Sequence, residues 1–194
     1  AKVITNRLRY IMDDIISEEQ SAFVPGRLIT DNVLVDYECV HAIRNRKRKK
    51  PLCAVKLDMM KAYDRVEWVF LQEMMERFGF APEWIAMIMH YVTTASFSVK
   101  LNGACSRCFL PSRGLRQGDP LSPYLFLFRV EGFSALLRKA QSENKLKGVT
   151  IGSTGPHITH LLFVDDSIVF FEGSPESLES DRGKGVPSFD DMVA

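Results

Sequence analysis

The first fifty residues carry apolar side chains at helical spacing. Apolar positions recur every three to four residues through segment 1–16, which predicts a helix there. Proline and glycine in segment 23–27 interrupt the pattern and predict a turn. A second apolar stripe then continues to Ile43, so we expect a second helix that is capped by Thr30 or Asp31.

The period changes from helical to alternating after the proline at position 51. Cys53, Val55 and Leu57 fall on one side of the run 52–58, because successive strand residues point to opposite faces. The pattern therefore predicts a strand with one apolar face, and Asp58 is its last residue.

Two helices, a hairpin and a long helix are predicted next. Helical spacing covers residues 68–78 and 82–93. Clean alternation over 96–101, followed by Asn-Gly, predicts a hairpin. Residues 121–140 are typical of a long, mostly apolar helix in which Arg129 interrupts the apolar run.

The stretch 160–171 is the most informative part of the chain. Two apolar, β-prone runs flank the adjacent carboxylates Asp165 and Asp166, which predicts a hairpin with this pair at its tight turn. Neighbouring carboxylates at a tip repel each other, and a cation such as Mg²⁺ relieves the repulsion because hard cations prefer carboxylate oxygens. The alternative is an ordinary polar turn between two strands.

Strands mixed with helices, and antiparallel pairing around the Asp165–Asp166 turn, predict an α+β domain. If the strand that ends at Asp58 pairs with this hairpin, three carboxylates meet at one edge of a sheet. Such an arrangement suits two cations about 3.5–4 Å apart, which clamp the attacking and leaving oxygens of a phosphoryl transfer. Three unrelated surface acids are the alternative that the pattern leaves open.

Composition changes this picture only slightly. The chain has 194 residues and a net charge of +1, so its overall charge gives no argument for nucleic acid as a partner. Residues 44–50 nevertheless form a dense basic run. That run could grip phosphates, act as a nuclear localisation signal or be a solvated helix end. No apolar run reaches the ~18 residues needed to span a bilayer, so no membrane is expected as a partner.

Cysteine and histidine chemistry has little support. Cys105 and Cys108 have the spacing of a zinc or redox pair, but the sequence offers no suitable second pair of ligands. The four cysteines, without a signal peptide, indicate a reducing intracellular compartment and not a disulfide framework. His157 and His160 are expected to be strand residues.

Four segments resemble the motifs of reverse transcriptases, in the order and spacing of that family. The likeness is greatest to non-LTR (LINE-type) retrotransposon polymerases, particularly those of plants, and it covers about residues 1–172. The segments are the fingers motif at 21–27 (SAFVPGR), motif A at 57–66 (LDMMKAYDRV), motif B at 113–123 (RGLRQGDPLSP) and motif C at 163–166 (FVDD). Each motif alone is modestly specific, whereas four in order are strongly so.

The resemblance implies the fingers–palm part of a right-hand polymerase, with an antiparallel palm sheet flanked by helices. Residues 1–50 would form a fingers-like helical part and residues 51–172 the palm, with the hairpin at 95–116 directed toward the fingers. The implied reaction is RNA-directed DNA synthesis, in which Mg²⁺ or Mn²⁺ assists extension of a DNA primer on an RNA template from deoxynucleoside triphosphates. Residues 173–194 depart from the family pattern, and we expect them to be disordered.

The resemblance also assigns the catalytic residues. Asp58 and Asp165 would hold the two metal ions, and Asp166 would support the same site. Tyr63 resembles the steric gate whose ring excludes a ribose 2′-hydroxyl. A tyrosine of the core is the alternative for this position.

Substrate contacts are implied at five further positions. Gln117 and Gly118 would contact the incoming nucleotide and the template, and Phe163 and Val164 would lie beneath the primer end. Arg27 would lie near the template or the triphosphate, or would be a surface arginine at a helix start.

Departures from the family pattern motivate two alternative functions. The upstream fingers segment, the thumb and the endonuclease and RNase H domains are not found in the sequence, so we expect a truncated copy that polymerises inefficiently by itself. One alternative is a catalytically inactive remnant that at most binds nucleic acid. The other is a template-free two-metal nuclease, which would leave Tyr63 and the Gln117–Gly118 loop without a role. The sequence gives no indication of the oligomeric state.

Overall fold

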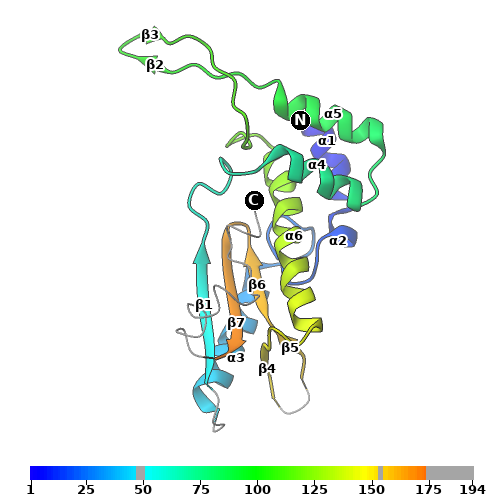
Figure 1. Ribbon diagram of the computed structural model, residues 1–194, viewed down its shortest axis with the longest axis vertical. Coiled ribbons are helices and arrows are strands. Elements are labelled where there is room, and N and C mark those ends of the chain that lie inside the picture. The colour runs from blue at the N-terminus through cyan, green and yellow to red at the C-terminus, as the bar shows by residue number, and fades with distance from the viewer. Residues whose placement is uncertain (47–50, 153–154, 174–194) are drawn as a thin grey trace. The chain divides into compact units, whose positions relative to one another are not determined.

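The computed structural model describes residues 1–46, 51–152 and 155–173, and its chain forms two compact units (Figure 1). Unit 1 comprises Ala1–Leu8 and Met60–Arg129, whereas unit 2 comprises Arg9–Met59 and the described residues from Val130 onward. The expected disordered tail lies outside the described residues except for its first residue, and so do the last four residues of the basic run.

Unit 2 is built on a three-stranded antiparallel sheet. Its strands are β1 (Leu52–Asp58), β6 (His160–Phe163) and β7 (Asp166–Glu172), in the order β1-β7-β6. Helix α3 (Ile29–Asn45) packs on this sheet, and the short helix α2 (Met12–Ile15) precedes it in the chain.

A small buried core holds unit 2 together. It contains Cys39 from α3, Leu161 and Phe170 from the sheet, and Val149 from the small two-stranded sheet of β4 (Val149–Thr150) and β5 (His157–Ile158). Burying such side chains is worth about 1.5–3 kcal/mol each, so this core fixes helix and sheet in one arrangement.

Unit 1 is mainly helical. It contains α1 (Lys2–Arg9) except for its last residue, α4 (Trp68–Arg77) and α5 (Pro82–Thr93), with α4 packed against α5. The long helix α6 (Ser122–Ser142) contributes residues to both units. Phe126 and Phe128 of α6 are fully buried, and Phe128 lies against the rings of Phe78 and Phe80.

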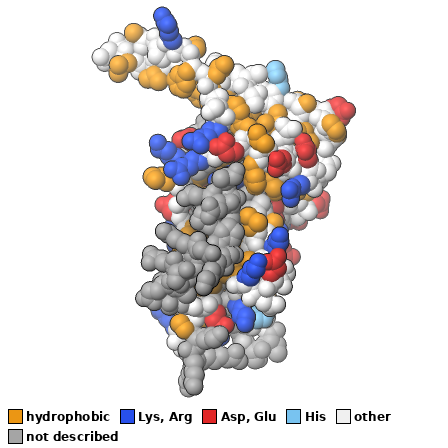
Figure 2. Space-filling view, viewed as in Figure 1, with side chains coloured by type: hydrophobic (Ala, Val, Ile, Leu, Met, Phe, Trp, Pro, Cys, Tyr) orange, Lys and Arg blue, Asp and Glu red, His pale blue; other side chains and the backbone are white. Residues whose placement is uncertain are grey.

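A hairpin of β2 (Lys100–Leu101) and β3 (Ala104–Cys105) extends from unit 1. Apolar side chains gather along this hairpin and its flanking residues (Figure 2). The exposed ones are Phe97, Val99, Leu101, Phe109 and Leu110. The observed strands β2 and β3 are therefore much shorter than the strands that the alternating pattern predicted. Few of the apolar side chains in this hairpin pack against a core that would stabilise longer strands.

Most of the predicted elements are confirmed. The strand over 52–58 has the predicted bounds, with Cys53, Val55 and Leu57 on its more buried side, and α5 also has the predicted bounds. The α+β architecture with an antiparallel sheet flanked by helices is confirmed as well.

Two helix predictions were wrong in detail. The helix over 1–16 is broken between α1 and α2, where the chain passes from unit 1 to unit 2. The N-cap residue of helix α3 is Leu28, so neither Thr30 nor Asp31 occupies the predicted N-cap position. Asp31 instead accepts a hydrogen bond from the Leu28 backbone N–H at 3.2 Å, which satisfies one of the free donors at this helix start.

Within the described residues, no helix combines the length and apolar character needed to cross a membrane. The four cysteines are free thiols, and Cys105 and Cys108 are exposed. His160 is a buried strand residue, as predicted, and its ring nitrogens are hydrogen-bonded to the hydroxyls of Ser134 and Thr159 at 2.7 and 2.9 Å.

Candidate active site

Asp58 and Asp166 are directly opposite each other in the β1–β7 pair of unit 2 (Figure 1). Opposite residues of an antiparallel pair point to the same face of the sheet, so the two carboxylates share one face. This face is solvent-exposed at Lys56, Asp58 and Asp166. The register between β1 and β7 is therefore sufficient to bring Asp58 of motif A next to Asp166 of motif C.

Asp165 lies in the turn that joins β6 to β7. Phe163 pairs with Asp166, so Val164 and Asp165 are the two loop residues. The predicted position of the turn was therefore wrong by one residue, because Asp166 is already part of the ladder and does not lie at the tip. Asp165 remains adjacent to the Asp58–Asp166 pair, at the end of the same sheet.

A lysine ammonium group lies among the three carboxylates. Lys56 Nζ is 2.8 Å from Asp166 Oδ1, across one diagonal of the ladder. The pKa of Lys56 is raised by the hydrogen bond to Asp166, and the charges of Asp58 and Asp165 raise it further. All three acids therefore act on a cation at this position.

The donor set fits a hard divalent cation in type and location, since carboxylate oxygens are the ligands that Mg²⁺ prefers. In the described part of the chain, however, no three acidic, histidine or cysteine side chains are already arranged around one metal position. Lys56 supplies the positive charge in this arrangement. Metal binding would require the Asp166 carboxylate to turn from Lys56 toward the ion, which an exposed side chain at the end of a strand can do.

The segment that leads into the fingers motif lies beside the hairpin in unit 2. Residues 19–21 run parallel to β6, with the Ser21 N–H donating to the Leu162 carbonyl at 3.3 Å and the Leu162 N–H donating to the Glu19 carbonyl at 2.8 Å. The side-chain oxygen of Gln20 accepts from the N–H of Val164 at 3.3 Å. This segment therefore supports the motif C turn from the side opposite to β1.

Arg27 has partners different from those that the resemblance implied. Its guanidinium group forms an ion pair with Asp13 at 2.7 Å. It also donates to the backbone carbonyls of Ile16, Ser17 and Gln20. Because most of its donors are used within its own unit, the structure favours a role in holding the 13–20 segment over contact with template or triphosphate.

In unit 1, the remainder of motif A is joined to motif B. The Leu115 N–H donates to the Tyr63 carbonyl at 2.9 Å, and the Gly114 N–H donates to the Val66 carbonyl at 2.8 Å. The Tyr63 ring is half-buried and stacks on Phe126, with 4.8 Å between the ring centroids and 11° between the planes. Tyr63 is therefore held in a fixed orientation from its backbone and from one ring face.

At Gly114 the backbone of motif B passes close to the backbone of motif A at Asp64. Its φ angle is +93°, and a Cβ atom there would lie 3.0 Å from the Asp64 carbonyl oxygen. Gly118 also has a positive φ angle, +83°, but a Cβ atom there would meet nothing within 4 Å. Gln117 and Gly118 are both exposed, so the loop presents them to solvent between two anchored ends.

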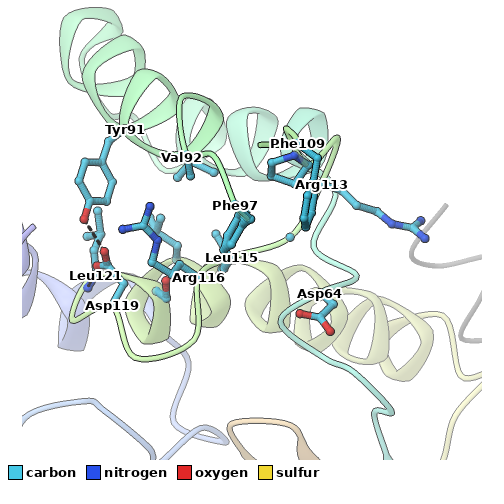
Figure 3. A pocket seen from close by; sticks show the side chains of 15 residues that line it. Asp64, Tyr91, Val92, Phe97, Phe109, Arg113, Leu115, Arg116, Asp119 and Leu121 are labelled. Atoms are coloured by element: carbon cyan, nitrogen blue, oxygen red, sulfur yellow. Dashed lines mark hydrogen bonds between the residues drawn. The ribbon is translucent and has the colours of Figure 1, made fainter. Parts of the chain in front are cut away.

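Asp119 anchors the far end of the loop, and the sequence analysis missed it. Its carboxylate accepts from the Leu121 N–H at 2.8 Å and from the Tyr91 hydroxyl, as the dashed lines in Figure 3 show. The pKa of Tyr91 is raised because its hydrogen atom is held by this carboxylate. The sequence did contain a signal for this role, because Asp119 lies just before a predicted helix and aspartate at such a position satisfies free N–H groups of the helix start.

A cavity of about 300 Å³ lies beside this loop within unit 1. Tyr91, Phe97, Phe109 and Arg116 are among its lining residues (Figure 3). The Arg116 guanidinium lies 5.9 Å from the centre of the Phe97 ring, a cation–π distance. The cavity therefore combines aromatic faces with a positive charge.

Comparison with known proteins agrees with this geometry. Residues 1–182 match the family described as reverse transcriptase (RNA-dependent DNA polymerase). An uncharacterized 149 kDa protein of transposon TX1 from Xenopus laevis is 31% identical over 87% of this chain and 12% of its own length. A Pol polyprotein from the retrotransposable element R2DM of Drosophila melanogaster is 29% identical over 79% of this chain and 14% of its own length. The chain thus spans a small part of these relatives.

A solved structure shows the same fold. Telomerase from Candida tropicalis, in a complex with a fragment of telomeric RNA, superposes with a TM-score of 0.61 over 98% of this chain and 30% of the telomerase chain, at 16% sequence identity. This likeness shows that the α+β elements are those of a polymerase fingers–palm region. The chain belongs to the reverse transcriptase family, and its relatives place it among the non-LTR (LINE-type) retrotransposon proteins that the four motifs predicted.

Proposed function

We propose that this chain is the catalytic region of an RNA-directed DNA polymerase, which extends a DNA primer on an RNA template with deoxynucleoside triphosphates. The observation that carries the proposal is the pairing of Asp58 with Asp166 at the end of one sheet, next to Asp165 in the turn. Family membership supports the reaction type, whereas the placement of the three acids supports the position of the chemistry.

The three carboxylates are the proposed metal ligands. Asp58 and Asp165 would hold two Mg²⁺ ions, or Mn²⁺ ions, and Asp166 would complete the site. Bound metal ions lower the pKa of a hydroxyl nucleophile and stabilise charge on the leaving oxygen. Lys56 offsets part of the negative charge of the three acids, which limits their mutual repulsion at this edge.

Selection of the nucleotide is assigned to unit 1. The Tyr63 ring is supported on one face by Phe126, so it would form a rigid wall against a ribose 2′-hydroxyl. Gln117 and Gly118 would contact the incoming nucleotide and the template, because they are exposed between the anchors Gly114 and Asp119. Phe163 and Val164 would lie beneath the primer end.

Calorimetric titration of Mn²⁺ into the purified chain, beside primer extension on an RNA template, tests this proposal. We expect Mn²⁺ binding and short, deoxynucleotide-dependent extension, both lost in Asp165→Asn. The matched control is Asp14→Asn, an exposed aspartate of α2 that is remote from the turn in sequence. A wild-type chain that binds no Mn²⁺ would overturn the proposal, as would extension that persists in Asp165→Asn.

A further inference from the structure

Val164, in the motif C turn, has a backbone conformation that its side chain disfavours. Its φ angle is +56°, in the left-handed region where a β-branched residue is a genuine outlier. Two-residue hairpin loops need a positive φ angle at their first residue, and glycine or asparagine usually provides it. Here the residue is valine, so something outside the hairpin must help to hold the turn.

Gln20 provides that contact. Its side chain is almost fully buried, at 1% exposure, and its Oε1 atom accepts two backbone hydrogen bonds, from Ala22 at 2.9 Å and from Val164 at 3.3 Å. Both partners are N–H donors, so the amide oxygen and not the nitrogen must face them. Pairing of the Gln20 backbone with Leu162 fixes the segment that carries this side chain.

The nitrogen atom of the Gln20 amide also indicates that this side chain is placed for its contact with the turn. Its Nε2 atom is buried and has no hydrogen-bond partner among the described residues. Burial of an amide nitrogen without a hydrogen bond costs free energy, so Gln20 does not stabilise the fold through this nitrogen. Its favourable contacts are those of the amide oxygen, one of which is with the turn.

We propose that Gln20 is a positioning residue for Asp165, acting through the backbone N–H of Val164. Asp166 is oriented by the ladder, since it is paired with Asp58 and Phe163, whereas Asp165 lies outside the ladder. The direction of the Asp165 carboxylate therefore depends on the conformation of the turn. Gln20 holds that conformation from a different segment, the one that leads into the fingers motif, so this segment and Asp165 are coupled. This inference rests on the proposed function, because it assigns Asp165 to metal binding.

The test is Mn²⁺ affinity of the full chain by calorimetry, in three variants beside the wild type. Gln20→Met keeps the length of the side chain but removes the acceptor, and we expect affinity to fall by about tenfold, the lower end of the effect of outer-shell changes at metal sites. Asn32→Leu is the matched control, because it removes a bond to the Leu162 carbonyl on the same strand but none to the turn. It should lower thermal stability and leave the Mn²⁺ affinity unchanged.

The third variant tests the route of the effect. In Gln20→Met/Val164→Gly, glycine adopts the positive φ angle without strain, so most of the lost affinity should return. Equal affinity of wild type and Gln20→Met would overturn this inference alone, and so would a double variant as weak as Gln20→Met. No Mn²⁺ binding by the wild-type chain would overturn the proposed function and this inference with it.

A measurement on the wild type covers the case in which Gln20→Met does not fold. Native-state hydrogen exchange should show a protected Val164 amide, although this residue lies in a partly exposed turn. Exchange of this amide at the rate of an open loop would contradict the proposed contact.

Discussion

Asp58 and Asp166 occupy directly opposite positions on neighbouring antiparallel strands, so two like charges share one face of the sheet. Like charges at such positions oppose strand pairing. The contact of Lys56 with Asp166 reduces the repulsion, but one ammonium group then balances the charges of three carboxylates. Stability at this edge is therefore lower than the same strands would have with neutral side chains.

Replacement of one of these acids should stabilise the metal-free chain. For Asp58→Asn we expect the free energy of unfolding to rise by about 0.2–1 kcal/mol, because a like-charge pair across the strands is removed. Chemical denaturation in the presence of a chelator measures this change. Asp14→Asn is the control, and a loss of stability in Asp58→Asn would contradict the repulsion.

Gly114 and Gly118 should respond differently to the same substitution. Gly118→Ala should lose about 1–2 kcal/mol, the cost of a left-handed backbone for a residue with a Cβ atom. Gly114→Ala should lose more, since its Cβ atom would also press on the Asp64 carbonyl at 3.0 Å. Urea denaturation of both variants measures the difference. Equal losses of stability in the two variants would show that the backbone at Asp64 can move away to accommodate a Cβ atom at position 114.

The stability of the chain should fall in mild acid because of His160. Burial is the main cause that lowers its pKa from 6.5 to about 4, and the charge of Arg138 adds to this effect, while Glu19 opposes it. Between these values the unfolded chain binds a proton that the folded chain does not, so stability is lost as the pH falls from about 6.5 toward 4.

From pH 7 to pH 5 this loss amounts to about 2 kcal/mol at most. His160→Gln should flatten the pH dependence of the free energy of unfolding over this range. His41→Gln is the matched control, because His41 is exposed on α3. A pH dependence unchanged by His160→Gln would place the titrating group elsewhere.

Arg129 is a buried charge within α6. It is 6% exposed, its guanidinium lies 5.9 Å from the Phe126 ring centre, and burial lowers its pKa. Burial of a charge costs free energy, and a hydrophobic residue of similar size in the same place does not carry that cost. We therefore expect Arg129→Met to equal or exceed the wild type in thermal unfolding, and Arg129→Lys to fall below it. The reverse order would indicate that the guanidinium stabilises the helix.

Local patterns were sufficient for the elements that carry the site. The alternation of Cys53, Val55 and Leu57 predicted β1 and its end at Asp58, because side chains of a strand alternate between faces. The same rule could have revealed Lys56, which lies on the Asp58 side of that strand. Its contact with Asp166 needs the register between β1 and β7, which no local pattern contains.

Other features depend on contacts that are distant in sequence. The turn was placed one residue late because adjacent aspartates indicate a turn strongly, whereas a valine with a positive φ angle is not suggested by any propensity. The contacts of Arg27 with the segment 13–20 were not foreseen, because only the structure brings these residues together. Gln20 gave no signal at all, since its proposed role depends on contacts with Val164 and Leu162, which are distant in sequence.

The β2–β3 hairpin has a practical consequence for work on this chain. In the described residues its two strands form a sheet of their own with two edges, and the side chains of Val99 and Leu101 are exposed beside it. Edges of this kind promote pairing between molecules and aggregation. We therefore expect the hairpin to promote association of the chain at high protein concentration, and a charged residue in place of Leu101 to reduce that association.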